Sequence, residues 1–137
     1  MTPKPVAIGV LLCDRVIVDK DTNSPSIGIF TGLAVESFPS ESQRFSVLAM
    51  LTDAQGDGRA RVAVYRLDEH WLRQDEIYAT EHAIRFPDRF AVINFSLRVR
   101  TIRFPAPAIY EFVMFVDSDE VAHRRLRVYP APPGSFV

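Results

Sequence analysis

Turn-forming residues divide the chain at short intervals, and this spacing constrains the fold more than any other feature. Clusters of Asp, Asn, Ser, Gly and Pro lie at residues 19–25, 37–41, 53–58, 86–88, 105–107 and 117–120. The runs between them are rich in Val, Ile, Phe and Tyr, whose side chains suit a pleated, half-buried surface. We therefore predict eight strands, at about residues 6–18, 27–35, 44–52, 59–67, 76–85, 89–104, 108–117 and 121–129. Short strands at this spacing are typical of a sandwich or barrel, and we predict an all-β chain folded as a single antiparallel β-sandwich.

The size and charge of the chain fit one soluble domain. Its 137 residues can bury roughly two thirds of the unfolded surface without a metal or a disulfide. Lys and Arg number 16 while Asp and Glu number 17, so the net charge of −1 does not favour nucleic acid or anionic lipid as a partner. We expect the β-sandwich domain to cover residues 5–129, followed by a Pro-rich extended or disordered tail over residues 130–137.

The first apolar run, residues 6–13, is predicted to be a strand rather than a lipidated leader. Bulky Leu12 precedes Cys13, where a processing peptidase needs a small residue. No stretch approaches the roughly 18 apolar residues of a membrane span. The single cysteine excludes an intrachain disulfide framework and indicates a reducing compartment. We expect a soluble protein of the cytoplasm.

Residues 89–104 carry the clearest strand pattern and also predict a break in it. Apolar residues occupy the odd positions from 91 to 99 and then change parity to Ile102 and Phe104. One extra residue turns every later side chain to the opposite face. We therefore predict a bulge, or a crossing between sheets, near Arg100 and Thr101.

Two further segments give expectations for local structure. Residues 108–117 are apolar on both faces apart from Glu111, which is typical of a central strand, and the turn that follows predicts a hairpin with residues 121–129. Residues 68–83 fit both helical and strand spacing. For them we predict a short helical turn at 68–74 followed by a strand.

Several short runs are shared with a known family. They are LLCDRVIVD at 11–19, SIGIF at 26–30, FP at 38–39, and the closing FP, IYEF, VD and LRV at 104–105, 109–112, 116–117 and 126–128. With these runs the chain resembles an uncharacterised bacterial family of small β-sandwich domains, which implies Ig-like or C2-like Greek-key packing. The resemblance implies a fold rather than a reaction, because the family carries no assigned activity. One departure is Ala108, where that family tends to place a glycine.

Asp14 is the first candidate site residue, because it interrupts the apolar face formed by the even positions from 6 to 18. A carboxylate there must be paired, hydrogen-bonded or placed at a bulge. Two roles stay open for it: an acceptor for loop N–H groups, or a contact to a ligand or metal. Cys13 is expected to be a small core residue, since no cationic or His-paired setting for a reactive thiolate is evident.

Acidic residues in the predicted loops are candidate calcium ligands at one end of the sandwich. Calcium takes about six to eight oxygens. The candidates are Asp14, Asp19, Asp53 and Asp117, with Asp21, Asp57 and Asp119 beside them. Aspartate is also an ordinary turn residue, and neither a fixed calcium spacing nor a zinc-type histidine spacing is present. We predict no metal and no cofactor, and keep a loop-based ligand- or calcium-binding sandwich as the alternative function.

Arginines and one tryptophan are candidates for binding surfaces. Two sets of arginines would form a basic stripe if their strands were adjacent, namely Arg98, Arg100 and Arg103, and Arg124, Arg125 and Arg127. Arginine side chains on exposed strands also commonly discourage pairing with the strands of another chain. We therefore do not expect a nucleic-acid partner. Trp71, beside Leu72 in a polar stretch, is either an exposed anchor of an interface or a cap over one end of the core.

The sequence contains no catalytic signature. It lacks a G-x-S-x-G elbow, a Gly-rich phosphate loop, an H-E-x-x-H motif and a Cys-His signature. We predict a non-enzymatic protein-interaction or accessory module with a protein partner. We also consider self-association through a strand edge, with residues 89–104 as the candidate.

Overall fold

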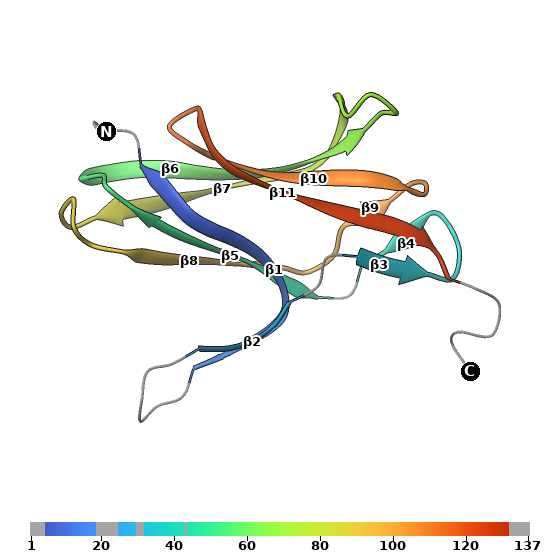
Figure 1. Cartoon of the computed structure of the whole chain (residues 1–137), viewed down its shortest axis with the longest axis horizontal. Helices are drawn as coiled ribbons and strands as arrows, with labels where there is room; N and C mark the ends of the chain where they lie inside the picture. The colour runs from blue at the N-terminus through green and yellow to red at the C-terminus, as the bar shows by residue number, and fades with distance from the viewer. Residues whose placement is uncertain (1–4, 19–24, 30–31, 43, 132–137) are drawn as a thin grey trace.

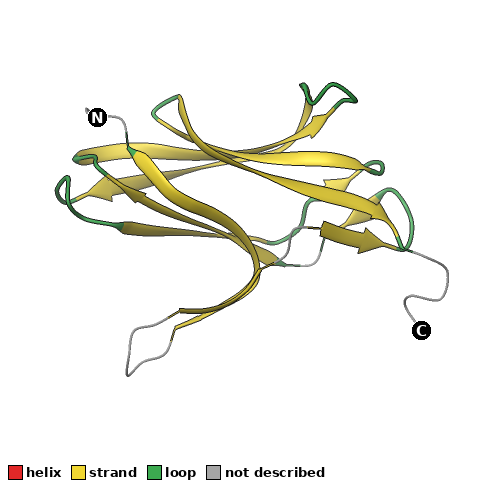
Figure 2. Ribbon diagram, in the orientation of Figure 1, coloured by secondary structure: helices red, strands yellow, loops and turns green. Residues whose placement is uncertain are grey.

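The computed structural model describes residues 5–18, 25–29, 32–42 and 44–131, with the side chains of all of these except 14–18 and 25–29 (Figure 1). Every regular element in this part of the chain is a strand (Figure 2). The strands are β1 (Val6–Val18), β2 (Pro25–Ile29), β3 (Gly32–Val35), β4 (Ser40–Glu41), β5 (Phe45–Thr52), β6 (Gly56–Leu67), β7 (Arg73–Phe86), β8 (Ile93–Val99), β9 (Arg103–Phe104), β10 (Ala108–Val116) and β11 (Asp119–Pro130). The all-β prediction is confirmed. The described residues contain no helix that could span a membrane.

The strands form two large sheets and one small one. The first sheet has the order β2-β1-β5-β8, the second has the order β3-β11-β10-β6-β7, and β4 pairs with β9. The pairing of β11 with β3 is parallel, whereas the other pairings are antiparallel. The prediction of a single antiparallel sandwich of eight strands is therefore not confirmed. Two expected strands are each divided, into β2 and β3 and into β8 and β9, the short strand β4 is additional, and the pairing of β3 with β11 is parallel.

The predicted break near Arg100 and Thr101 is confirmed as a crossing between sheets. β8 ends at Val99, and β9 joins β4 instead of continuing in the sheet of β8. The N–H of Ile102 donates to Ser42 Oγ over 2.9 Å, which holds the crossing segment against the chain before β5. The change of parity thereby brings Ile102 and Phe104 into the buried core.

The hydrophobic core lies between the two large sheets, which form two layers in Figure 1. Alternate residues of β5 and β10 supply much of it: Phe45, Val47, Ala49 and Leu51, and Tyr110, Phe112, Met114 and Val116. Phe45 and Phe112 meet edge to face across the layers, with 5.8 Å between ring centroids. Cys13 is fully buried, as expected. β10 lies between β11 and β6 and forms a hairpin with β11, so both predictions for this segment are confirmed.

The predicted helical turn at 68–74 is wrong. Strand β7 already begins at Arg73, and residues 68–72 form the loop of the β6–β7 hairpin. In Figure 1 this hairpin curls away from the four-stranded layer at the upper right. Side-chain hydrogen bonds to the loop backbone explain why it does not become helical, and they also build the candidate site.

Candidate functional site

The loop of the β6–β7 hairpin is organised by Asp68. Its Oδ1 atom accepts hydrogen bonds from the N–H groups of His70 and Leu72, over 2.8 and 3.0 Å. Its Oδ2 atom accepts from Gln74 Nε2 over 3.0 Å. The Asp68 N–H donates to the Leu72 carbonyl over 2.9 Å and closes the hairpin. An aspartate that bonds to the N–H two residues later defines a local turn, so the loop has one preferred shape.

Trp71 lies at the tip of this loop in an unusual conformation. Its φ angle is 64°, in the left-handed region that disfavours residues with a Cβ atom. The residue is 54% exposed and the neighbouring Leu72 is 61% exposed. The interpretation of Trp71 as a cap over the core is therefore wrong. Trp71 is exposed, and its role as the anchor of an interface stays a prediction.

Beneath the hairpin, Glu111 is a buried carboxylate on the face of β10 that points away from the core. It is 4% exposed and is the buried charged residue among those the structure describes. Arg73 Nε donates to its Oε1 over 2.6 Å, and Arg125 Nε donates to its Oε2 over 3.2 Å. The register places Glu111 opposite Arg125 of β11 and opposite Tyr65 of β6. Burial of the charge is tolerated because two guanidinium groups neutralise and hydrogen-bond it.

Arg125 connects this buried carboxylate to the exposed tryptophan. Its guanidinium carbon lies 4.5 Å from the centroid of the Trp71 ring. Such a cation–π contact is worth about 0.5–1 kcal/mol at an exposed site. Glu111 therefore orients Arg125, and Arg125 supports the indole ring from below. We call the set Trp71, Leu72, Arg125 and Glu111 the hairpin cluster.

Arg73, which also bonds to Glu111, makes further contacts with Glu120 and Tyr65. Its Nη1 atom lies 2.5 Å from Glu120 Oε1, and its guanidinium carbon is 5.6 Å from the Tyr65 ring centroid. The hydrogen bond from Arg73 lowers the pKa of Glu120, and His123 lowers it further. The carboxylate of Glu120 therefore stays ionised to lower pH than an ordinary glutamate.

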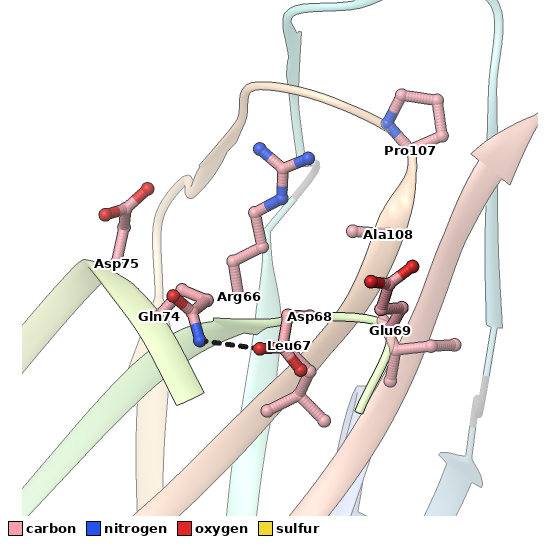
Figure 3. Close-up of a pocket in the computed structure, with 9 residues that line it drawn as sticks. Arg66, Leu67, Asp68, Glu69, Gln74, Asp75, Pro107 and Ala108 are labelled. Carbon is pink, nitrogen blue, oxygen red and sulfur yellow. Dashed lines mark hydrogen bonds between the residues drawn. The ribbon is translucent and has the colours of Figure 1, made fainter. Parts of the chain in front are cut away.

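A cleft of about 520 Å³ opens between the hairpin and the segment before β10 (Figure 3). Its polar lining comprises Arg66, Asp68, Glu69, Gln74 and Asp75. Asp68 and Gln74 are hydrogen-bonded to each other, as the dashed line marks. One arginine among three carboxylates gives the cleft a net negative charge.

The remaining predicted site residues do not join this cluster. Asp53 lies in the turn after β5 and pairs with Arg89, with 2.9 Å between Oδ1 and Nη2. Asp117 Oδ1 accepts from the Arg59 N–H over 2.9 Å in the β10–β11 turn. The side chain of Asp14 and the whole of Asp19 lie outside the described residues. In the described part of the chain, no group of three or more His, Cys, Asp or Glu residues could hold a metal ion.

The predicted basic stripe does not form. Arg98 lies on β8 in the four-stranded sheet, and Arg125 and Arg127 lie on β11 in the five-stranded sheet. The sequence did not indicate Glu111 or Arg73 as site residues, and it indicated Arg125 only as part of the basic stripe. The available signal was Glu111, the one acidic residue within an otherwise apolar central strand.

Comparison with known proteins identifies a family whose function is unknown. No curated protein matches the chain. The model of a family of unknown function, DUF6941, matches residues 9–129, which include every residue of the hairpin cluster. This span is most of the 137 residues. The chain therefore belongs to the DUF6941 family of unknown function.

Proposed function

We propose that this protein is a non-enzymatic protein-interaction module whose contact surface is the tip of the β6–β7 hairpin. Trp71 and Leu72 are the anchor residues in this proposal. Tryptophan is among the residues most enriched at binding hot spots, where one aromatic side chain carries much of the binding energy. The partner is a protein that offers an apolar pocket to the indole ring.

The observation that carries the proposal is the exposed tryptophan in a left-handed conformation. A Cβ-bearing residue costs roughly 1–2 kcal/mol in this region, which glycine adopts freely. The cation–π contact with Arg125 offsets part of this cost. A residue that is strained and exposed at once contributes little to folding. The presence of tryptophan at this position is explained if its indole ring binds another molecule.

The hairpin cluster also prepares the tip for binding. Asp68 holds the loop backbone, and Arg125, anchored by buried Glu111, supports the ring. A side chain ordered before binding loses less conformational entropy when the complex forms. This arrangement favours binding by a Trp71 side chain that is already in place, rather than by a loop that folds only when the partner binds.

We further propose that the scaffold is a β-sandwich with Ig-like or C2-like packing. The two large sheets share one hydrophobic core. In addition, the Tyr110 hydroxyl donates to the Ala106 carbonyl over 2.6 Å, four residues upstream. A tyrosine that bonds back to the backbone near the start of a strand is a feature of Greek-key sandwiches.

Affinity capture from the lysate of the source organism tests the interaction function. The baits are the tagged wild type, Trp71→Gly, and Phe90→Ser as a matched control. Phe90 is an aromatic residue of the β7–β8 turn that is 94% exposed. We expect a protein that is retained by the wild type and by Phe90→Ser but lost with Trp71→Gly. A partner that all three baits retain equally would contradict the assignment of the surface, and the absence of any partner would contradict the function.

A further inference from the structure

Strand β8 forms one edge of the four-stranded sheet. Within the described residues it pairs with β5 alone, so the backbone groups along its other side are open to a further strand. The strand INFSLRV contains no proline, no acidic residue and a single charge, Arg98. β7, at the edge of the other large sheet, instead carries five charges: Arg73, Asp75, Glu76, Glu81 and Arg85. Such charges discourage strand addition, and β8 is therefore the less protected edge.

Apolar side chains remain partly uncovered on both edge strands, β8 and β7. Ile93 and Phe95 of β8, and Ile77 and Tyr78 of β7, pack against the core without being fully buried. The rings of Phe95 and His82 lie 5.8 Å apart, so the two edges are neighbours across the layers. A strand added to β8 would cover Ile93 and Phe95.

The sequence of β8 is complementary to itself in one antiparallel register. Side chains that oppose each other must lie on the same face of the sheet. Full overlap of the seven residues places Ser96 opposite Ser96 of the second copy. On the core face Ile93 then opposes Val99 and Phe95 opposes Leu97, and on the other face Asn94 opposes Arg98. This register contains no like-charge pair, whereas a two-fold axis at Arg98 would bring two guanidinium groups together.

We infer that two copies of the chain associate through antiparallel β8–β8 pairing centred on Ser96. The pairing joins two four-stranded sheets into one continuous sheet with two-fold symmetry. A two-fold axis is the commonest symmetry of soluble oligomers and requires a patch that complements itself. The β8 edge and the hairpin cluster lie on different sheets, so this inference and the proposed function can fail independently.

Cysteine crosslinking tests both the surface and the register. Residues directly opposite in an antiparallel pair have Cα atoms about 4.5–5.5 Å apart, within the range of a disulfide. We expect Ser96→Cys to form a disulfide-linked dimer under mild oxidation. Asn94→Cys is the matched control, because its two copies would lie four residues apart along the strands, at about 13 Å. The native Cys13 is fully buried and does not compete.

Sedimentation equilibrium of the unmodified full chain gives the second readout. We expect a mass near twice the 15.5 kDa of the chain at high micromolar concentration. Ser96→Lys, which sets two ammonium groups against each other, should return the monomer, whereas Ala79→Lys on β7 should not. A monomeric wild type overturns the inference. A dimer in which Ser96→Cys does not crosslink, or crosslinks no better than Asn94→Cys, also overturns it.

Discussion

At the residue scale, substitutions at Trp71 distinguish the strain of its backbone from the contact that its side chain makes with Arg125. Glycine at this position removes the left-handed strain and also removes the contact with Arg125, so Trp71→Gly should unfold within about 1 kcal/mol of the wild type. Trp71→Ala removes the same contact but keeps the strain, and should be about 1 kcal/mol less stable than Trp71→Gly. Urea unfolding followed by circular dichroism measures both variants. Equal stabilities of the alanine and glycine variants would show that the backbone at position 71 is not strained.

The hydroxyl of Tyr110 is predicted to ionise at a higher pH than that of an ordinary tyrosine, because its pKa is raised. Burial raises the pKa of its hydroxyl, and the N–H of Ala106, which donates to the hydroxyl oxygen, only partly opposes this effect. Since the folded-state pKa lies above the unfolded one, the stabilisation is complete below the unfolded value near 10 and is lost as the pH rises through the folded value. Tyr110→Phe should therefore show a weaker loss of stability above pH ~10.

Absorbance at 295 nm follows the tyrosinates directly. The chain has four tyrosines, and the highest-pH step of the wild-type curve should be absent from Tyr110→Phe. If the variant keeps this late step, another tyrosine is the source of it and the assignment to Tyr110 is wrong.

At the scale of elements, the β6–β7 hairpin should loosen when its buried anchor is neutralised. Glu111→Gln leaves Arg73 and Arg125 without their shared carboxylate, which should cost about 1–3 kcal/mol of unfolding free energy. Trp71 is the only tryptophan of the chain, so intrinsic fluorescence reports on the hairpin tip alone. We expect a red-shifted emission and stronger quenching by iodide or acrylamide.

Glu81→Gln is the matched control for this experiment. Glu81 lies on β7 of the same sheet and faces Arg59 at 3.7 Å, but both side chains are more than half exposed. Exposed ion pairs contribute little, so stability and emission should stay near the wild-type values. An unchanged emission of Trp71 in Glu111→Gln would show that Arg125 needs no carboxylate to hold the ring.

The elements differ in how far the sequence predicts them. The crossing near Arg100, the central position of β10 and its hairpin with β11 follow from parity and apolar content, and all three are confirmed. The hairpin loop was not predictable from periodicity, because residues 68–83 fit both the helical and the strand period. The side chain of Asp68 decides between them by bonding to the loop backbone, a local interaction that hydrophobic patterns do not register.

Only part of the candidate site was predictable from the sequence, because its contacts join distant parts of the chain. The exposure of Trp71 was one of two readings of an aromatic residue in a polar stretch. Glu111 was visible as a polar exception in an apolar strand. Its partners Arg73 and Arg125 were not visible, because they reach it only through the register of four neighbouring strands, β11, β10, β6 and β7. The parallel pairing of β3 with β11 is likewise a contact between distant parts of the chain, which local sequence does not specify.

At the scale of the whole molecule, one core joins the two large sheets, and this predicts cooperative unfolding. Leu51 is fully buried on β5 in the four-stranded sheet, whereas Trp71 reports from the five-stranded sheet. Leu51→Ala should lower the unfolding free energy by about 2–5 kcal/mol. If the layers unfold together, urea transitions followed by Trp71 fluorescence and by far-ultraviolet circular dichroism should coincide in the wild type and shift equally in the variant. Met50→Ala, one residue away and only partly buried, should shift both transitions less. A fluorescence transition that stays in place while the circular dichroism transition moves would mean that the five-stranded sheet folds without its partner layer.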